Sequence, residues 1–360
     1  DGTGTQARLS NPEYLTIDGS GNLYVTENAG FASRLRRISP AQEVTTFHDF
    51  VSGDGVSAIA AAGDGSVYGL GTGALSSTVQ RIAPGGAVSL IAGGAGLDGN
   101  VDGTGAAARF NLPLGLVFGA DGNLYVTDGN NFAVRRVTPA GAVTTVSGAR
   151  VFPAEPADGT GTAGRYRFPT AIGRAPNGDL LVGDFDTMRR LTPSFVLTTF
   201  VGQRLATGTV DGSGAAARFR APLLGVALDA SGNAYVADND RIRVVTPAGA
   251  VSTLVTQQPA QLIVRDVGSG FVVASSNAVW RMTAAGVRTL LAGDPTLSDY
   301  VDAPVGTDAR FGAIRGIAVD GSGNVFVAET INQNATIRRI TPSGEVTTWA
   351  GAKDVLFSEP

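Results

Sequence analysis

One stretch of sequence decides the fold: DGTGAAARFNLPLGLVFGADGNLYVTDGNNFAVRRVTPAGAVTTVSG, which runs from Asp102 to Gly148. ADGN and TPAG divide it into short segments rich in β-branched and aromatic residues, as strands between tight turns require. The stretch therefore predicts four strands, here called a to d, over Leu114–Phe118, Asn123–Thr127, Ala133–Val137 and Val143–Ser147. The DGxGxxARF segment before strand a is called the leader.

The same order of segments recurs along the whole chain. Full copies lie at Asp1–Phe47, Asp158–Gly202, Asp211–Val255 and, more loosely, Val305–Gly351, and shorter copies without a leader lie at Val56–Gly93 and Gln261–Gly293. Four-stranded units repeated about every fifty residues without helices are typical of propeller blades.

We therefore predict an all-β, seven-bladed propeller of four-stranded antiparallel blades. The alternative is a six-bladed propeller, in which one of the two short copies is an insertion. The predicted blades cover residues 1–50, 51–94, 95–149, 150–203, 204–257, 258–294 and 295–351, followed by a C-terminal tail over 352–360.

Three of the copies resemble NHL repeats: TDGNNFAVRRVTPAG, ADNDRIRVVTPAG and ETINQNATIRRITPSG. The resemblance covers nearly the whole chain, although the histidine of the family's name is missing and Phe132 stands in its place in blade three. It implies a β-propeller of the bacterial, non-enzymatic type. Roles differ widely among propellers of one fold, so the resemblance specifies architecture rather than activity.

Composition narrows the choice of partners. The net charge of -4 gives no reason to expect nucleic acid, which selects a basic face. No apolar run approaches the ~20 residues of a membrane-spanning helix, so we expect no membrane insertion. The chain opens at Asp1 inside a repeat, which suggests a processed segment. We expect a periplasmic, secreted or cell-surface protein.

Strand order predicts which loops share a side. The d–a leaders and b–c loops belong to one side of the blades, the leader side, and the tight a–b and c–d turns belong to the other, the turn side. Variable loops on a rigid scaffold are where binding residues concentrate. We therefore place a protein or glycan partner on the leader side. The candidate anchors are the aromatic residues of its b–c loops, Phe31, Phe132 and Phe185.

An acidic residue ends strand b in five blades, and an arginine follows a few residues later. A ring of carboxylates could bind cations, but a feature that repeats in blade after blade favours structural pairing inside each blade. The five acidic residues are Glu27, Asp128, Asp184, Asp238 and Glu329.

The leaders carry a second repeated charge, an arginine that precedes phenylalanine or leucine. A basic ring could attract an anionic ligand. The structural interpretation is that the aromatic residue wedges between blades while the arginine bridges the leader aspartate. The arginines are Arg8, Arg109, Arg167, Arg218 and Arg310.

Candidate catalytic and metal-binding residues are few. Asp98, Asn100 and Asp102 match the start of a calcium loop, but Arg109 stands where the loop needs a bidentate acid. One histidine, His48, cannot assemble a triad or a histidine metal site. We predict no catalytic residues, metal or cofactor. The alternative is a metal-dependent lactonase or hydrolase with carboxylates in a central channel.

Overall fold

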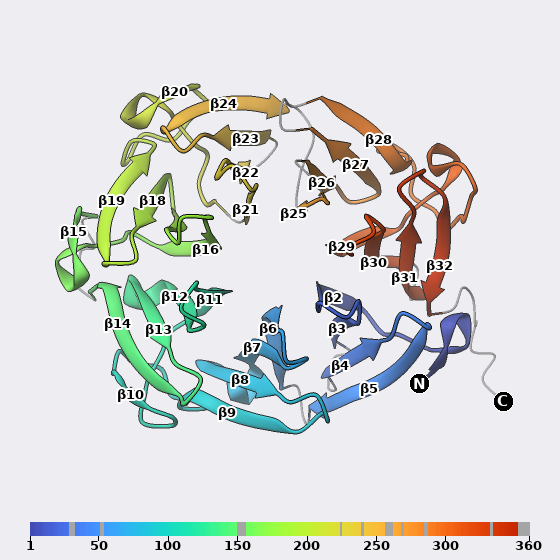
Figure 1. Ribbon diagram of the computed structural model, residues 1–360, viewed down its shortest axis with the longest axis horizontal. Coiled ribbons are helices and arrows are strands. Elements are labelled where there is room, and N and C mark those ends of the chain that lie inside the picture. The colour runs from blue at the N-terminus through green and yellow to red at the C-terminus, as the bar shows by residue number, and fades with distance from the viewer. Residues whose placement is uncertain are drawn as a thin grey trace. The chain divides into compact units, whose positions relative to one another are not determined.

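The computed structural model describes residues 1–28, 33–50, 54–149, 156–223, 225–238, 241–255, 262–267, 270–283, 287–331 and 334–351. Its strands form seven antiparallel sheets of four or five strands, and the fold is a seven-bladed β-propeller (Figure 1). The predicted number of blades is confirmed. In blade three the four predicted strands are present, each within two residues of its predicted ends.

The first three blades contain the following elements. Blade one has β1 (Gly2–Thr3), η1 (Gly4–Gln6), β2 (Pro12–Ile17), β3 (Leu23–Asn28), β4 (Ser33–Ile38) and β5 (Glu43–Phe50). Blade two has β6 (Gly55–Ala61), β7 (Val67–Thr72), η2 (Gly73–Leu75), β8 (Thr78–Ile82) and β9 (Val88–Gly93). Blade three has β10 (Gly103–Thr104), β11 (Pro113–Phe118), β12 (Leu124–Asp128), η3 (Gly129–Asn131), β13 (Ala133–Val137) and β14 (Ala142–Gly148).

The remaining four blades continue the pattern. Blade four has β15 (Gly159–Thr160), η4 (Gly161–Ala163), β16 (Pro169–Arg174), β17 (Leu180–Asp184), β18 (Thr187–Leu191) and β19 (Val196–Val201). Blade five has β20 (Gly212–Ser213), η5 (Gly214–Ala216), β21 (Gly225–Leu228), β22 (Ala234–Asp238), β23 (Arg241–Val245) and β24 (Ala250–Val255). Blade six has β25 (Leu262–Arg265), β26 (Phe271–Ala274), β27 (Ala278–Met282) and β28 (Arg288–Gly293). Blade seven has η6 (Gly306–Asp308), β29 (Ala313–Val319), β30 (Val325–Ile331), β31 (Asn334–Ile340) and β32 (Val346–Ala350).

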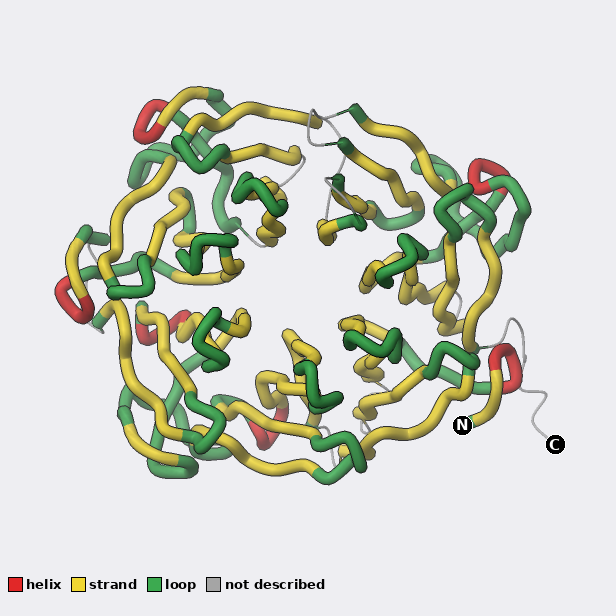
Figure 2. The backbone as a smooth tube through the Cα atoms, in the orientation of Figure 1, coloured by secondary structure: helices red, strands yellow, loops and turns green. Residues whose placement is uncertain are grey.

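The four predicted strands are present in every blade, and blades one, three, four and five each have a fifth strand that was not predicted. In each of these the two residues after the leader aspartate form a fifth strand antiparallel to strand d, as Gly103 and Thr104 do against Val143 and Ala142. Strand d is the outer edge of its sheet, and an uncovered edge exposes unpaired backbone groups. The leader covers part of that edge, and η4 and η5 follow it at the outer margins of blades four and five (Figure 2).

The chain divides into two compact units. Unit one comprises residues 1–67, 82–87 and 264–360, and unit two comprises residues 68–81 and 88–263. Within unit one, strand β29 of blade seven lies against β2 of blade one, and a Cβ atom built on Gly316 would lie 2.7 Å from the carbonyl oxygen of Glu13. A side chain at position 316 would therefore separate the two inner strands.

Unit two repeats one hydrogen bond between neighbouring blades. The Thr127 hydroxyl of blade three donates to the carbonyl oxygen of Thr170 in blade four at 2.7 Å. The Thr170 hydroxyl in turn donates to the carbonyl oxygen of Leu223, which precedes β21 of blade five, at 2.6 Å. Apolar side chains of adjacent blades fill the space between the sheets, as Tyr125 and Val134 of blade three do with Val182 of blade four.

Candidate functional site

The five acidic residues at the ends of strand b are buried against arginines of strand c. Asp128 and Arg135 are both fully withdrawn from solvent, and their charged atoms lie 2.8 Å apart. The Asp128 carboxylate also accepts hydrogen bonds from the backbone N–H of Asn111 and the side chain of Asn131. The equivalent pairs are Glu27–Arg36, Asp184–Arg189, Asp238–Arg243 and Glu329–Arg338.

The same arginines hold the leaders. Arg135 reaches the leader aspartate Asp102 at 2.7 Å and donates to the carbonyl oxygen of Val101 at 3.0 Å. Asp102 accepts two further hydrogen bonds from Thr145 in strand d. One guanidinium therefore joins the leader to strands b and c, and Asp102 extends the network to strand d. The corresponding leader pairs are Asp1–Arg36, Asp158–Arg189, Asp211–Arg243 and Asp302–Arg338.

The pKa values of the two carboxylates in the blade-three network shift in opposite directions. Burial raises the pKa of Asp128 by more than the hydrogen bonds from Asn131 and Asn111 and the charge of Arg135 lower it. Burial also acts upward on Asp102, but its hydrogen bonds from Thr145 and the charge of Arg135 leave the pKa of that carboxyl below its usual value. Ionising the buried carboxyl of Asp128 therefore costs more free energy than ionising that of Asp102.

The leader arginines do not bridge the leader aspartates, contrary to our expectation. Arg218 instead donates to the carbonyl oxygens of Ala215 and Ala217 in the turn that precedes it. The leader aspartate instead forms its ion pair with the strand-c arginine, which approaches it from inside the blade. Arg8, Arg109 and Arg310 make the same backbone hydrogen bonds as Arg218.

In blade four the leader arginine lies two residues before the predicted Arg167. The leader arginine equivalent to Arg109 is Arg165, whose carbonyl oxygen accepts from Arg189 as that of Arg109 accepts from Arg135. Arg167 instead forms an ion pair with Asp186 at 3.0 Å. In the segment AGRYRF, Tyr166 is the buried wedge residue, at the position where blades three, five and seven have phenylalanine.

The structure describes two of the three candidate aromatic anchors, and Phe31 lies outside the described residues. Phe132 is half-buried and packs against the cluster that contains Val134 and Val146. Phe185 is half-buried beneath the guanidinium of Arg167, 4.0 Å from its ring centre. Both aromatic rings therefore pack against other side chains of the propeller.

Protein groups also engage the candidate metal and catalytic residues. Asp98 accepts a hydrogen bond from the Ser77 hydroxyl, and Asp102 is held by Arg135. His48 lies in β5 and packs edge-on against Phe50. Within the ranges that the structure describes, no three His, Cys, Asp or Glu side chains gather as a metal site would require.

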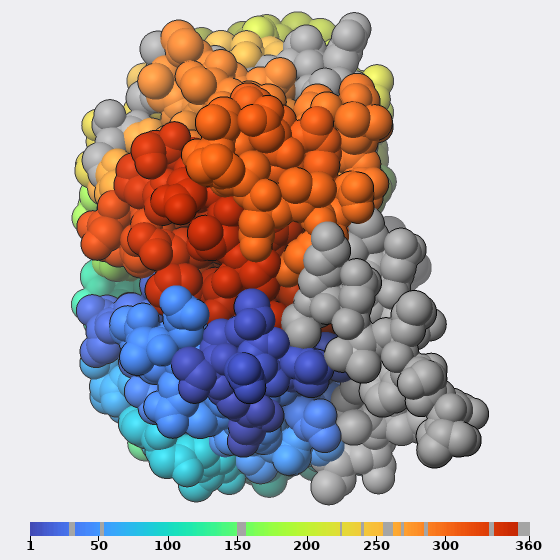
Figure 3. Space-filling view, turned by 90° about the vertical axis from the view of Figure 1, so that its right-hand side faces the viewer, coloured from blue at the N-terminus to red at the C-terminus, as the bar shows by residue number. Residues whose placement is uncertain are grey.

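Most of the exposed large hydrophobic residues lie in the connections that contain the leaders. Of 13 large hydrophobic residues exposed in the described parts of the chain, eight lie between strand d of one blade and strand a of the next. The segment before blade seven, orange in Figure 3, is part of this surface. The eight residues are Leu97, Val101, Leu112, Leu205, Val210, Leu297, Val301 and Val305.

Three of these residues occupy one position of the repeat. Val101, Val210 and Val301 each precede a leader aspartate and are 49%, 57% and 36% exposed. Each carbonyl oxygen accepts a hydrogen bond of 2.8 to 3.0 Å from the buried strand-c arginine of its blade. The network therefore fixes the backbone beneath an exposed valine.

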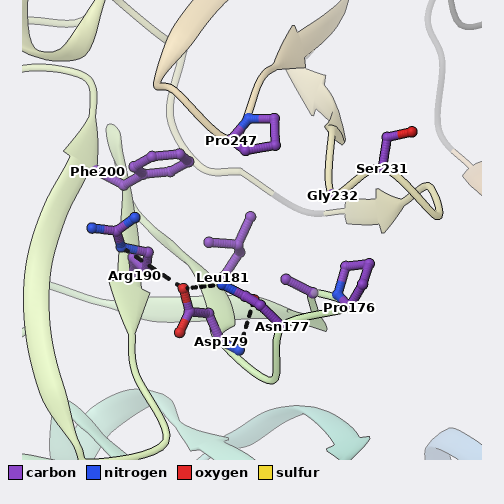
Figure 4. Close-up of a pocket in the computed structure, with 10 residues that line it drawn as sticks. Pro176, Asn177, Asp179, Leu181, Arg190, Phe200, Ser231, Gly232 and Pro247 are labelled. Carbon is purple, nitrogen blue, oxygen red and sulfur yellow. Dashed lines mark hydrogen bonds and ion pairs between the residues drawn. The ribbon is translucent and has the colours of Figure 1, made fainter.

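A pocket of about 180 Å³ lies on the turn side of unit two, between blades four and five (Figure 4). Its apolar lining consists of Leu181 and Phe200 with Pro176 and Pro247. The Arg190 guanidinium lies over the Phe200 ring, 5.2 Å from its centre, and its Nε atom is 4.0 Å from a carboxylate oxygen of Asp179. A second pocket of about 250 Å³ lies between blades three and four.

Known proteins share the repeat and its arrangement. The NHL repeat family matches residues 110–136. Teneurin-3 of Mus musculus is 28% identical over 298 residues, which are 71% of this chain and 11% of that protein. Teneurin-m of Drosophila melanogaster is 23% identical over 322 residues, which are 65% of this chain and 12% of that protein. The chain is a β-propeller in which blade three carries an NHL repeat. It spans about a tenth of the length of these curated relatives.

Solved structures share the propeller fold of this chain. A streptogramin B lyase structure superposes with a TM-score of 0.64 at 14% identity, covering 97% of both chains. PorZ, a bacterial surface component of the type-IX secretion system of Porphyromonas gingivalis, gives a TM-score of 0.58 at 13% identity, covering 99% of this chain and 40% of its own. At these identities the likeness concerns the fold alone. In the described part of the chain, no helix is long and apolar enough to cross a membrane.

Sequence reasoning missed the residues of the turn-side pocket. Blades one, two, three, five and seven carry an aromatic residue at the second position of strand b, whereas Leu181 occupies that position in blade four. Asp179 likewise replaces the asparagine that ends the a–b turn in four other blades, including Asn123 and Asn233. A comparison of the repeats for departures on the turn side would have found both residues.

Proposed function

We propose that this NHL propeller is a non-catalytic scaffold that binds a protein partner through its leader side. NHL propellers commonly mediate protein binding. The observation that carries the proposal is that Val101, Val210 and Val301 are exposed at the same position of the repeat, each fixed by the buried arginine of its blade. An apolar side chain on a backbone that is already ordered loses little conformational entropy when it is covered, so it suits an interface.

The chemistry of this surface favours protein over glycan. Its exposed residues are aliphatic, whereas both described aromatic candidates, Phe132 and Phe185, pack against other side chains of the propeller. The interface anchors that we propose are therefore Val101 and Val210 in unit two, in place of the phenylalanines. Exposed aliphatic residues that stand alone are ordinary on soluble proteins. The repetition at one position, with the same backbone hydrogen bond beneath it, distinguishes these valines.

Retention of partners by the immobilised propeller tests this proposal. We would compare the wild type with the double variant Val101→Glu/Val210→Glu, because charge at the anchors would oppose burial of the interface. Val287→Glu is the matched control, since Val287 is 63% exposed but lies in a c–d turn of blade six. Partners that bind the wild type and the control but not the double variant support the leader side. Equal retention by all three proteins would refute it.

The absence of catalysis and the location of the protein stay predictions. Incubation with divalent metals followed by elemental analysis tests the first, and a stoichiometric ion would favour the lactonase or hydrolase alternative. Fractionation of the native source tests the expected periplasmic, secreted or cell-surface location.

A further inference from the structure

Blade four departs from the repeat at the pocket between blades four and five. In blades one and seven the strand-b aromatic packs beside a side chain of strand d: Tyr24 against Phe47, and Phe326 against Trp349. With Leu181 at that position, one face of Phe200 borders the pocket instead. The pocket therefore has an aliphatic side chain in its lining (Figure 4), where the equivalent pocket between blades three and four has Tyr125.

The polar groups of the pocket depart from the repeat as well. In blades one and seven the second arginine of strand c donates to the turn asparagine, at 3.0 Å from Arg37 to Asn22 and 3.2 Å from Arg339 to Asn324. In blade four the turn residue is Asp179, which accepts from Asn177 and lies 4.0 Å from Arg190. The pocket thus presents a carboxylate acceptor beside a guanidinium donor.

We propose that this pocket binds a peptide segment, with one apolar side chain between Leu181, Phe200 and the two prolines and an adjacent amide hydrogen-bonded by Asp179 and Arg190. An amide offers one donor and one acceptor, which match the carboxylate and the guanidinium. The volume of about 180 Å³ is below the ~300 Å³ at which pockets for drug-sized ligands begin, so it suits a single side chain. The pocket lies on the turn side and is independent of the leader anchors.

Amino acids blocked at both ends test the proposal, because they carry one side chain between two amides. We would record saturation-transfer NMR of N-acetyl-leucinamide and N-acetyl-phenylalaninamide on the whole chain, with N-acetyl-glycinamide as the probe that lacks a side chain. Both apolar amides should receive saturation, and the glycine amide should not. Equal transfer to all three probes, or to none, would overturn the proposal.

Two variants locate the binding. Leu181→Tyr restores the residue of blades one, three and five, so it should fold normally and abolish binding by filling the pocket. Arg190→Gln should weaken binding ~10-fold, because a hydrogen bond from a charged donor is lost. Arg339→Gln removes the equivalent arginine of blade seven, which lies over Trp349, and should leave binding unchanged.

Three results would contradict the site. Undiminished binding to Leu181→Tyr would exclude the pocket, and equal losses in Arg190→Gln and Arg339→Gln would show a general effect of charge. Tighter binding of benzoate than of the amides would show that Arg190 alone binds anions, without a role for Asp179.

Discussion

The carboxylate of Asp128 and the guanidinium of Arg135 form an ion pair of 2.8 Å with neither side chain exposed to solvent. Removing two charges from water costs more than one contact returns, so such a pair persists only where further hydrogen bonds complete it. Here the backbone N–H of Asn111 and the side chain of Asn131 donate to the carboxylate, while Asp102 and the carbonyl oxygen of Val101 accept from the guanidinium. The network orders the leader from inside the blade.

Removal of the buried acid should destabilise the fold. Asp128→Ala leaves Arg135 charged and buried without its inner partner, and we expect a loss of ~3 kcal/mol in the free energy of unfolding. Urea unfolding measures this loss. Asp49→Ala is the control, because Asp49 forms an exposed pair with Arg34 and should cost less than ~1 kcal/mol. Equal losses in both variants would show that burial of the pair does not matter.

The leader aspartate Asp102 should make the free energy of unfolding depend on pH. The pKa of Asp102 is lower in the folded state than in the unfolded chain, so its contribution is present above the unfolded value and is lost as the pH falls through the folded value. Unfolding free energies of the wild type and Asp102→Asn should therefore converge between about pH 5 and pH 2. The raised pKa of Asp128 acts in the opposite sense but is common to both proteins. Parallel profiles would contradict the assignment.

Substitutions at two turn glycines distinguish the cost of backbone strain from the cost of a steric clash. Gly122 and Gly141 both have positive φ, but a Cβ on Gly141 would lie 2.3 Å from the carbonyl oxygen of Ile91, whereas one on Gly122 meets nothing within 4 Å. Gly122→Ala should cost ~1–2 kcal/mol through its backbone conformation alone. Gly141→Ala should cost clearly more, because blade two must move away from blade three. Thermal unfolding of the two variants checks the order, and the reverse order would be inconsistent with the contact.

The two described phenylalanines should affect stability rather than binding. Phe132→Ser removes packing against the cluster around Val134, and Phe185→Ser removes the ring beneath Arg167, so each should cost ~2 kcal/mol. Folded variants should retain every partner of the wild type. Loss of a partner at unchanged stability would restore these residues as anchors.

Much of the architecture could be predicted because the same order of turns and apolar segments recurs along the sequence. Turn residues and β-branched runs determined the blade count and the strands of blade three. The fifth strand was missed because Gly103 and Thr104 are too short a segment to show an alternating pattern. The pocket was missed for another reason: Leu181 and Asp179 have meaning only as departures from the other blades.

Site-specific photo-crosslinking tests the central claim most directly. A photoreactive amino acid would replace Val101 in a leader and, in a separate protein, Val287 in a c–d turn, both of which are exposed. The account predicts that a protein partner retained by the wild type crosslinks at position 101 and not at position 287. Crosslinking of that partner at position 287 alone, or at neither position, would contradict binding through the leader side.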